Sequence, residues 1–351
     1  MALFSKNIRI VLTPILLTNL SFAARSSTPV LPSTPVYRVL KSIRLGGNGG
    51  WDCLTVDPDA RRLYISRGTH VMVVDADSGV IVGDIPETNG VHGIALVAAL
   101  NKGFISNGRD NTVSVFDLKT LHVSKQIPVG KNPDIIIYDP HSKLVYTGNG
   151  NSQDLSVIDP AGETVKATIP LNGKPEFAVA DEGHVYVNLE DKSLIARVDT
   201  RKMTVDARWP LVPGEEPTGL AIDQKHHRLF AACGNKTMII VNTDDGKVIA
   251  TVPIGVGPDG AEFDSSSQLA FSPNGADGNL TIIHEESPNK FSVAQTLVTQ
   301  RGARTMTLDT KTHEVFLVTA EFGPPPGPTA ERPRPRPSIV PGSFTLLIVG
   351  K

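Results

Sequence analysis

The sequence has little of several features that define large classes of proteins. Its 351 residues include only two cysteines, which exclude a disulfide framework and a cysteine-based zinc cluster. Aromatic residues make up 5% of the chain, and 34 basic against 36 acidic residues leave a formal charge of −2. Nucleic-acid binding is therefore not expected. A Gly-x-Ser-x-Gly elbow, a His-Glu-x-x-His helix and a phosphate loop are all missing, so we assign no catalytic residue.

Long apolar runs are missing too, except near the N-terminus. Lys6 and Arg9 precede a mostly apolar run over residues 10–20, and small residues follow it. This order is typical of a secretory signal peptide, because the run is shorter than the ~20 residues that cross a bilayer. We predict a signal peptide over residues 1–23, a linker over 24–36, and a soluble periplasmic or secreted product with no membrane span.

A repeat with a period near 42 residues runs through the rest of the chain. Seven copies begin at similar segments such as WDCLTVDPDARRLYIS and PTGLAIDQKHHRLFAA. The second residues of the seven copies are Asp52, His92, Asp134, Glu176, Thr218, Asp259 and Arg304. Within each copy, short β-branched apolar runs alternate with turn clusters, which indicates four strands. We therefore predict an all-β, seven-bladed β-propeller of four-stranded antiparallel blades over residues 37–351.

The ends of the repeat predict how the ring closes. The last copy lacks its outermost strand, whereas an extra strand-like segment, YRVLKSIRLG, precedes the first copy. We expect this N-terminal strand to complete the last blade, so that no sheet edge is left over there. Turns such as DPAG and DDGK predict Asx hydrogen bonds and positive-φ glycines. Cys53 and Cys233 fall in blades one and five, and we expect both to be reduced and buried.

Two units of the repeat carry a resemblance to a known family. The segments VGKNPDIIIYDPHSKLVYTGNGNSQDLSVIDPAGETVKATIPL and GVGPDGAEFDSSSQLAFSPNGADGNLTII resemble the YVTN-type repeat of YncE-like β-propellers. The resemblance covers residues 37–351 and implies an exported bacterial propeller with a binding or interaction role. The pattern is more distantly similar to propellers of the gluconolactonase type and of amine-dehydrogenase heavy chains, which implies that the fold also supports chemistry.

The topology predicts a site at the mouth of the central channel. The seven second residues given above enter the innermost strands, so they should form a rim around that mouth. Four of them are acids, whose repulsion must be relieved by pairing, protonation or a ligand. We expect Arg304 to neutralise Asp259 or Asp52. We expect His92 to titrate with its neighbours Asp52 and Asp134.

Two further groups of polar residues are predicted on the same face. Asp134 and Glu176 are neighbours in the ring with no expected cation, which favours them for a ligand amine or for Ca²⁺, Mg²⁺ or Mn²⁺. The second group lies near the ends of second strands and consists of Asn107, Asn149, Asn188, Asn235 and Asn274, with Arg67 and Glu321 in the first and last blades. These amides either complete a coordination shell, hydrogen-bond a polyol, or fill turn positions for local reasons.

A proline-rich insertion is predicted on this face as well. Residues 323–342, GPPPGPTAERPRPRPSIVPG, lengthen the loop between the second and third strands of blade seven. Arg332, Arg334 and Arg336 alternate with proline, which suits a partner-docking arm or a lid, and the alternative is a solvated loop. The remaining histidines of interest, His141, His226, His227 and His313, fall on the opposite face and are expected to be ordinary surface residues.

Two functions of different class are consistent with this pattern. The favoured one is an exported, monomeric, non-catalytic β-propeller that binds a small molecule, a glycan or a protein partner through its channel-mouth face. The alternative is a divalent-metal-dependent hydrolase or lyase of the lactonase type. In that case Asp134 and Glu176 hold a Ca²⁺, Mg²⁺ or Mn²⁺ ion that polarises a carbonyl or activates water.

Overall fold

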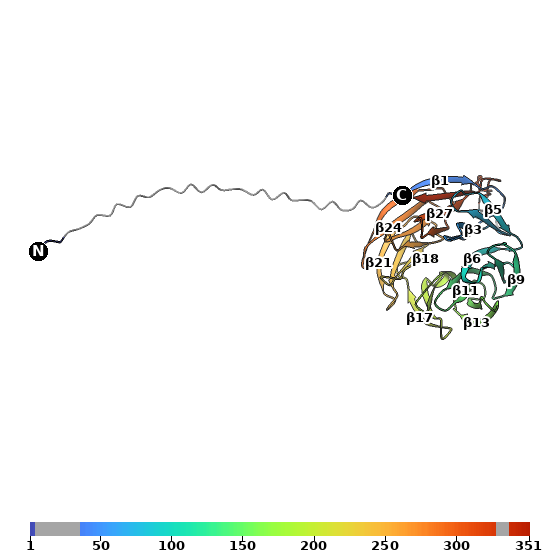
Figure 1. The fold of residues 1–351 in the computed structure, drawn as a ribbon, viewed down its shortest axis with the longest axis horizontal. Coiled ribbons are helices and arrows are strands. Elements are labelled where there is room, and N and C mark those ends of the chain that lie inside the picture. The colour runs from blue at the N-terminus through green and yellow to red at the C-terminus, as the bar shows by residue number, and fades with distance from the viewer. Residues whose placement is uncertain (4–35, 328–336) are drawn as a thin grey trace. The chain divides into compact units, whose positions relative to one another are not determined.

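The computed structural model of the chain describes residues 1–3, 36–327 and 337–351. Seven four-stranded antiparallel sheets form a ring (Figure 1), which confirms the predicted all-β, seven-bladed β-propeller. The described residues contain two short 3-10 turns, η1 (Ala98–Leu100) and η2 (Glu190–Lys192), and no helix among them is long and apolar enough to cross a membrane. The predicted signal peptide lies almost wholly, and Arg332, Arg334 and Arg336 entirely, outside the described residues.

The first three blades each use four consecutive strands. Blade one contains β2 (Leu54–Asp57), β3 (Arg62–Ser66), β4 (Val71–Asp75) and β5 (Ile81–Ile85). Blade two contains β6 (Val91–Val97), β7 (Lys102–Asn107), β8 (Thr112–Asp117) and β9 (Val123–Pro128). Blade three contains β10 (Pro133–Asp139), β11 (Leu144–Asn149), β12 (Asp154–Asp159) and β13 (Thr164–Pro170).

The other four blades complete the ring. Blade four contains β14 (Pro175–Asp181), β15 (His184–Leu189), β16 (Leu194–Asp199) and β17 (Thr204–Pro210). Blade five contains β18 (Pro217–Asp223), β19 (Arg228–Cys233), β20 (Thr237–Asn242) and β21 (Val248–Pro253). Blade six contains β22 (Glu262–Asp264), β23 (Leu269–Asn274), β24 (Asn279–Ser287) and β25 (Lys290–Val298). Blade seven contains β26 (Met306–Asp309), β27 (Glu314–Thr319), β28 (Thr345–Gly350) and β1 (Arg38–Arg44).

The core lies between the blades. The described residues form seven apolar clusters, and each cluster joins two adjacent blades, including blades seven and one. Middle strands such as β11 and β19 are buried along their whole length because both of their faces meet a neighbouring blade. Outer strands such as β13 are mostly exposed. The continuous apolar runs in the sequence are therefore the middle strands of the blades.

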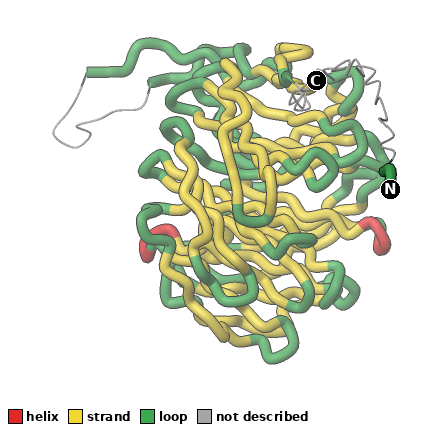
Figure 2. The backbone as a smooth tube through the Cα atoms, turned by 90° about the vertical axis from the view of Figure 1, so that its left-hand side faces the viewer, coloured by secondary structure: helices red, strands yellow, loops and turns green. Residues whose placement is uncertain are grey.

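The two faces of the ring can be told apart by their loops. Each first strand begins on the face where the second strand ends, so these segments share one face, here called the rim face. The turns η1 and η2 follow a first and a second strand, respectively, and Figure 2 shows them on opposite sides of the molecule. Anything at the start of a first strand therefore belongs to the rim face, and anything at its end belongs to the opposite face.

The ring closes through the N-terminal strand, as predicted. β1 pairs antiparallel with β28 from Arg38 opposite Gly350 to Arg44 opposite Thr345. The pairing continues past the strand, because the Leu45 N–H donates to the Phe344 carbonyl at 2.8 Å. Blade seven is thus assembled from both ends of the propeller.

The hairpins use the predicted Asx hydrogen bonds but fewer positive-φ glycines than expected. At the end of β2, Asp57 Oδ1 accepts hydrogen bonds from the N–H groups of Asp59 and Ala60 at 3.0 and 2.9 Å. In the DDGK turn Gly246 has the expected positive φ of 73°. In the DPAG turn the left-handed residue is Glu163, with φ 51°, so the prediction of a positive-φ glycine there is wrong.

Candidate functional site at the channel mouth

The seven rim residues lie where the chain enters the innermost strands. Four of them, His92, Asp134, Glu176 and Thr218, are the second residues of β6, β10, β14 and β18. The other three, Asp52, Asp259 and Arg304, shortly precede the shorter strands β2, β22 and β26. The four acids converge near Cys53. Burial raises the pKa of the Cys53 thiol, and the charges of Asp52, Asp134, Asp259 and Glu176 raise it further.

One group of rim residues joins blades one, two and three. His92 Nδ1 lies 2.5 Å from Asp52 Oδ2 and 3.4 Å from Asp134 Oδ1. Burial lowers the pKa of His92, but the hydrogen bond to Asp52 and the two carboxylate charges outweigh this and raise it to about 9. Burial raises the pKa of Asp134 to about 7, although the His92 charge opposes the shift. The contact of His92 with both acids is as predicted.

A second group joins blades six, seven and one. Arg304 Nε donates to Asp259 Oδ2 at 2.6 Å, and the Arg304 guanidinium also lies 3.8 Å from Asp52 Oδ1. Its position is fixed by a further hydrogen bond, 3.1 Å long, to the Trp51 carbonyl. Burial raises the pKa of Asp259, which the Arg304 charge partly offsets. The predicted role of Arg304 between Asp259 and Asp52 is confirmed.

The third group contains a cation that the sequence analysis missed. Lys174 Nζ lies 2.9 Å from Glu176 Oε2 and also pairs with Glu190, so the expectation of no cation beside Asp134 and Glu176 is wrong. Even so, burial and the Asp134 charge raise the pKa of Glu176 to about 8 against the effect of Lys174. Lys174 stands two positions before the rim residue, where blades one and two have Gly50 and Gly90.

The amide residues do not belong to the rim. Asn107, Asn149 and Asn188 are completely buried. Asn107 donates to Thr112 and Ser114, and Asn149 donates to Asp154 and Ser156, in each case within one blade. These contacts favour the alternative of a local structural role over the predicted role in ligand binding.

Other polar groups predicted on this face are committed to the scaffold as well. Asn274 repeats the pattern of Asn107, and Asn188 donates to the Gly219 carbonyl at 2.9 Å. The Thr218 hydroxyl donates to the Pro258 carbonyl at 2.8 Å and so holds blades five and six together. Arg67 is buried with its guanidinium 3.5 Å from the centre of the Phe344 ring.

Two further residues predicted on this face make polar side-chain contacts at the surface. Asn235 donates to the Pro213 carbonyl at 2.8 Å, and Glu321 pairs with Arg44 at 2.5 Å. Both contacts lie at the surface. Of the described residues predicted for this face, the charged rim residues are the ones we regard as available to a ligand.

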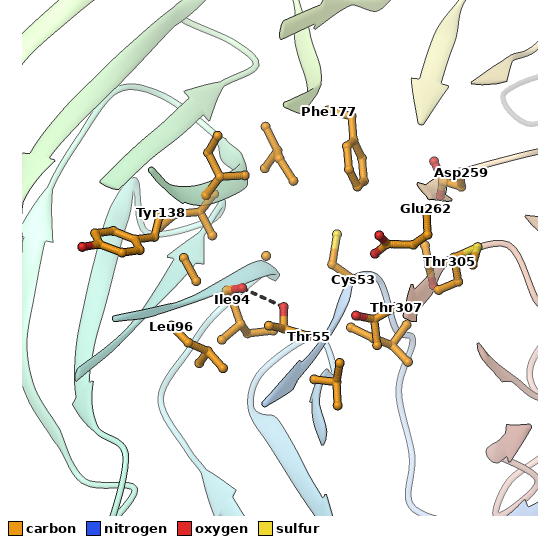
Figure 3. A pocket seen from close by; sticks show the side chains of 18 of the residues that line it. Cys53, Thr55, Ile94, Leu96, Tyr138, Phe177, Asp259, Glu262, Thr305 and Thr307 are labelled. Atoms are coloured by element: carbon orange, nitrogen blue, oxygen red, sulfur yellow. Dashed lines mark hydrogen bonds between the residues drawn. The ribbon is translucent and has the colours of Figure 1, made fainter. Parts of the chain in front are cut away.

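Below the rim lies a cavity of about 480 Å³, the central channel (Figure 3). Its walls are mostly apolar and include Ile94, Phe177 and Met306. Cys53 and Glu262 also line it, so Cys53 is partly exposed rather than buried as predicted, while Cys233 is buried and neither forms a disulfide. The volume falls in the range of small-molecule sites, roughly 300–1,000 Å³.

Glu262 is the channel residue that the sequence analysis missed. It begins β22 three positions after Asp259, in the register that places Thr55 and Thr307 on the channel wall in blades one and seven. Figure 3 shows these three side chains around the same space. Burial raises the pKa of Glu262 to about 8. The signal that could have revealed Glu262 in the sequence is the presence of a charged residue in an apolar innermost strand.

The described ends of the proline-rich insertion lie on the rim face, as predicted. Phe322 and Ile339 form a β-bridge at its base. The Phe322 ring packs on Trp51 with ring centres 6.1 Å apart, and Pro337 lines a hollow of about 260 Å³ together with Arg304. The insertion therefore begins and ends beside the rim.

Comparison with known proteins supports the fold and leaves the site unassigned. No family model matches the sequence. The chain is 45% identical over 60 residues to Antigen Lp49 of Leptospira interrogans serogroup Icterohaemorrhagiae serovar copenhageni (strain Fiocruz L1-130), a match that covers 17% of this chain and 13% of that protein. Among solved structures it is similar to a chain of Kuenenia stuttgartiensis hydrazine synthase, with a TM-score of 0.68 and 16% identity over 76% of this chain and 92% of that one. At 16% identity the similarity between the two chains concerns the fold alone, and it agrees with the seven-bladed ring.

Proposed function

We propose that this protein is a non-catalytic β-propeller that binds a small organic cation, such as a primary amine, at its channel mouth. The cation would lie among the rim carboxylates, and its apolar part would enter the channel below. This proposal narrows the favoured function from the sequence, a propeller that binds a partner through this face.

The observation that carries the proposal is an excess of partly buried carboxylate at the rim. His92, Lys174 and Arg304 each contact two acids, yet the pKa values of Asp134 and Glu176 remain raised to about 7 and about 8. The raised pKa values of these two carboxyls mean that the rim favours uptake of positive charge, here in the form of protons. A ligand cation supplies the same charge, and Phe177 and Ile94 offer apolar surface for its carbon chain.

We further infer that the protein acts outside the cytoplasm as a propeller of the YVTN type. Two features of the sequence support this: the repeat units over residues 37–351, and the order of Lys6, Arg9 and the apolar run that follows them. A binding role also fits a fold that presents wide loop surfaces around a central channel.

Titration calorimetry with hexylamine tests the proposed function. At pH 8.5, where the Asp134 and Glu176 carboxyls are mostly ionised, the wild type should bind hexylamine at least about tenfold more tightly than the uncharged hexanol. Asp134→Asn and Glu176→Gln should each weaken hexylamine binding by about tenfold, the equivalent of 1.4 kcal/mol. Asp84→Asn removes an exposed carboxylate on β5 and serves as the control. Equal binding of amine and alcohol, or unchanged binding in both rim variants, would refute the proposal.

A second candidate function rests on one cluster of the rim. One ligand atom from each of Asp52, His92 and Asp134 lies within 4.8 Å of the others, as in a metal site. A divalent ion bound there would polarise a substrate carbonyl or lower the pKa of a bound water, as a metal-dependent hydrolase or lyase requires. Glu176, held by Lys174, is not part of this cluster, so the donor set differs from the Asp134 and Glu176 pair predicted from the sequence.

Thermal unfolding with added ions separates the two candidates. If the rim holds a metal, Ca²⁺, Mg²⁺ or Mn²⁺ should raise the melting temperature of the wild type but not that of Asp134→Asn. Lactone hydrolysis that depends on the same ion and is lost in the same variant would favour the enzyme. No ion-dependent shift and no turnover would leave amine binding as the function of the rim.

A further inference from the structure

A second cluster of ligand-type side chains lies on the face opposite the rim, between blades five and six. Asp223 ends the first strand β18, His226 lies in the hairpin that follows, and Glu285 belongs to the third strand of the next blade, β24. His226 Nδ1 lies 2.6 Å from Asp223 Oδ2 and 3.1 Å from Glu285 Oε1. One ligand atom from each of the three residues lies within 4.8 Å of the others.

The two carboxylates are buried, and the carboxylate of Glu285 accepts no hydrogen bond. Asp223 is 2% exposed and Glu285 is 1% exposed. Asp223 Oδ1 accepts the Lys225 N–H at 3.1 Å, which leaves Oδ2 facing the cluster, and neither oxygen of Glu285 accepts a hydrogen bond. Among the described residues no lysine or arginine nitrogen lies within 4 Å of either carboxylate. Arg228 donates instead to the Pro288 carbonyl at 2.6 Å.

At two other interfaces of the ring the aspartate at the end of the first strand pairs with a base. In blade seven, Asp309 pairs with Arg61 of blade one. In blade six, Asp264 lies 3.1 Å from His313 of blade seven. In both cases the next blade supplies a basic side chain from the left-handed position of its own hairpin, where φ is 55° for Arg61 and 60° for His313.

Between blades five and six the base is absent from this position, as it also is between blades one and two (Asn101) and between blades three and four (Glu182). The same left-handed position of blade six is Gln268, which is neutral, and its carbonyl accepts the Glu285 N–H at 2.9 Å. Glu285 follows the sixth residue of β24 and so occupies the repeat position of Ala76, Leu118 and Thr243, whose N–H groups also donate to the left-handed hairpin residue of their own blade. An acid thus lies beside Asp223, where the interfaces of blade six with seven and of blade seven with one have a base. Two buried carboxylates of this kind require a compensating positive charge.

We propose that Asp223, His226 and Glu285 bind a divalent transition-metal ion between blades five and six. The donors are one imidazole nitrogen and two carboxylate oxygens, a set that suits Zn²⁺ and Mn²⁺ better than Ca²⁺ or Mg²⁺ because of the nitrogen ligand. The His226 side chain is 17% exposed, so the cluster is open to water on one side, which can supply a further ligand. Such an ion would link two blades on the face away from the rim.

Calorimetry with Zn²⁺ on the full chain, first stripped with a chelator, tests this site. The wild type should bind one equivalent with a Kd below about 1 μM, and Co²⁺ in its place should give visible absorption bands of a nitrogen- and oxygen-ligated ion. Glu285→Gln and His226→Gln should each weaken Zn²⁺ binding by at least about a hundredfold. Two variants are used because a single substitution could weaken binding by disturbing the fold. Circular dichroism of both variants checks that the fold is unchanged.

The matched control is the neighbouring histidine. His227 pairs with the exposed Asp244 instead of the cluster, so His227→Gln should bind Zn²⁺ like the wild type. Asp84→Asn, which removes an exposed carboxylate on β5, should also leave this binding unchanged. Absence of Zn²⁺ binding in the wild type, or binding that survives in both Glu285→Gln and His226→Gln, would overturn the proposal and leave a proton as the charge that the acids share.

Discussion

A chain that begins at Gly46, and so lacks β1, should unfold about 10 °C or more below a chain that begins at Pro35. Removal of β1 takes away six paired positions along β28 and the buried Tyr37, which is 1% exposed. Tyr37 packs edge-on against Phe271 with ring centres 5.4 Å apart. Loss of a large buried aromatic side chain alone costs about 3–5 kcal/mol, and 1 kcal/mol corresponds to about 2 °C in a protein of this size.

The shortened chain should also aggregate. β28 is buried along all six of its residues, TLLIVG, and without β1 it becomes the outer edge of blade seven. An exposed apolar edge strand pairs readily with other chains. We therefore expect concentration-dependent light scattering from the shortened chain and none from the longer one.

Addition of the missing strand in trans provides the control. A synthetic peptide covering residues 35–45 should restore much of the melting temperature and suppress scattering, while a peptide of the same composition in scrambled order should do neither. Equal melting temperatures for the two chain lengths would contradict the view that β1 closes the ring.

Glu262→Gln should stabilise the protein above pH 8 and leave its stability nearly unchanged near pH 4. Burial raises the pKa of Glu262 from 4.5 to about 8. Below pH 4.5 the carboxyl is protonated in both the folded and the unfolded chain. Between pH 4.5 and 8 the folded chain keeps a proton that the unfolded chain has lost, so the free energy of unfolding falls as pH rises.

The size of this effect follows from the pKa shift. Each pKa unit corresponds to about 1.4 kcal/mol, which sets an upper limit of about 5 kcal/mol for the gain at pH 9. Water in the channel reduces the cost of the charge, so we expect roughly 3 kcal/mol. Urea unfolding at pH 4, 6.5 and 9 measures it, with the exposed Glu215→Gln as the control. A gain in Glu262→Gln that does not change with pH would contradict a buried, titrating carboxyl.

The sequence was sufficient to predict the fold because the fold depends on spacing. Strand-length apolar runs repeated every 42 residues leave few alternatives to a propeller, and the missing last strand indicated how the ring closes. Ring order also predicted that Arg304 would lie between Asp259 and Asp52, since those contacts join residues at the same repeat position.

The differences from the prediction concern residues whose roles depend on burial or lie outside the repeat register. Asn107 and Asn149 occupy suitable positions along the chain, but their side chains point into the blade, where they bind neighbouring hydroxyls. Lys174 lies off the register of the rim residues and was not considered beside Glu176. His226 was predicted to be an ordinary surface residue, because its contact with Glu285 joins two neighbouring blades at a repeat position that is Ala76, Leu118 and Thr243 in other blades.

Closure by β1 also constrains the order in which the molecule can be built during translation. Blades one to six are each encoded by consecutive residues, so each can form soon after it leaves the ribosome. β1 precedes all the other strands in the sequence, yet its partner β28 follows all of them. Until then the leading strand has no place to pair, and the propeller remains an open arc. A nascent chain whose β28 has not yet left the ribosome therefore forms an incomplete ring, which makes β28 the segment that completes the assembly.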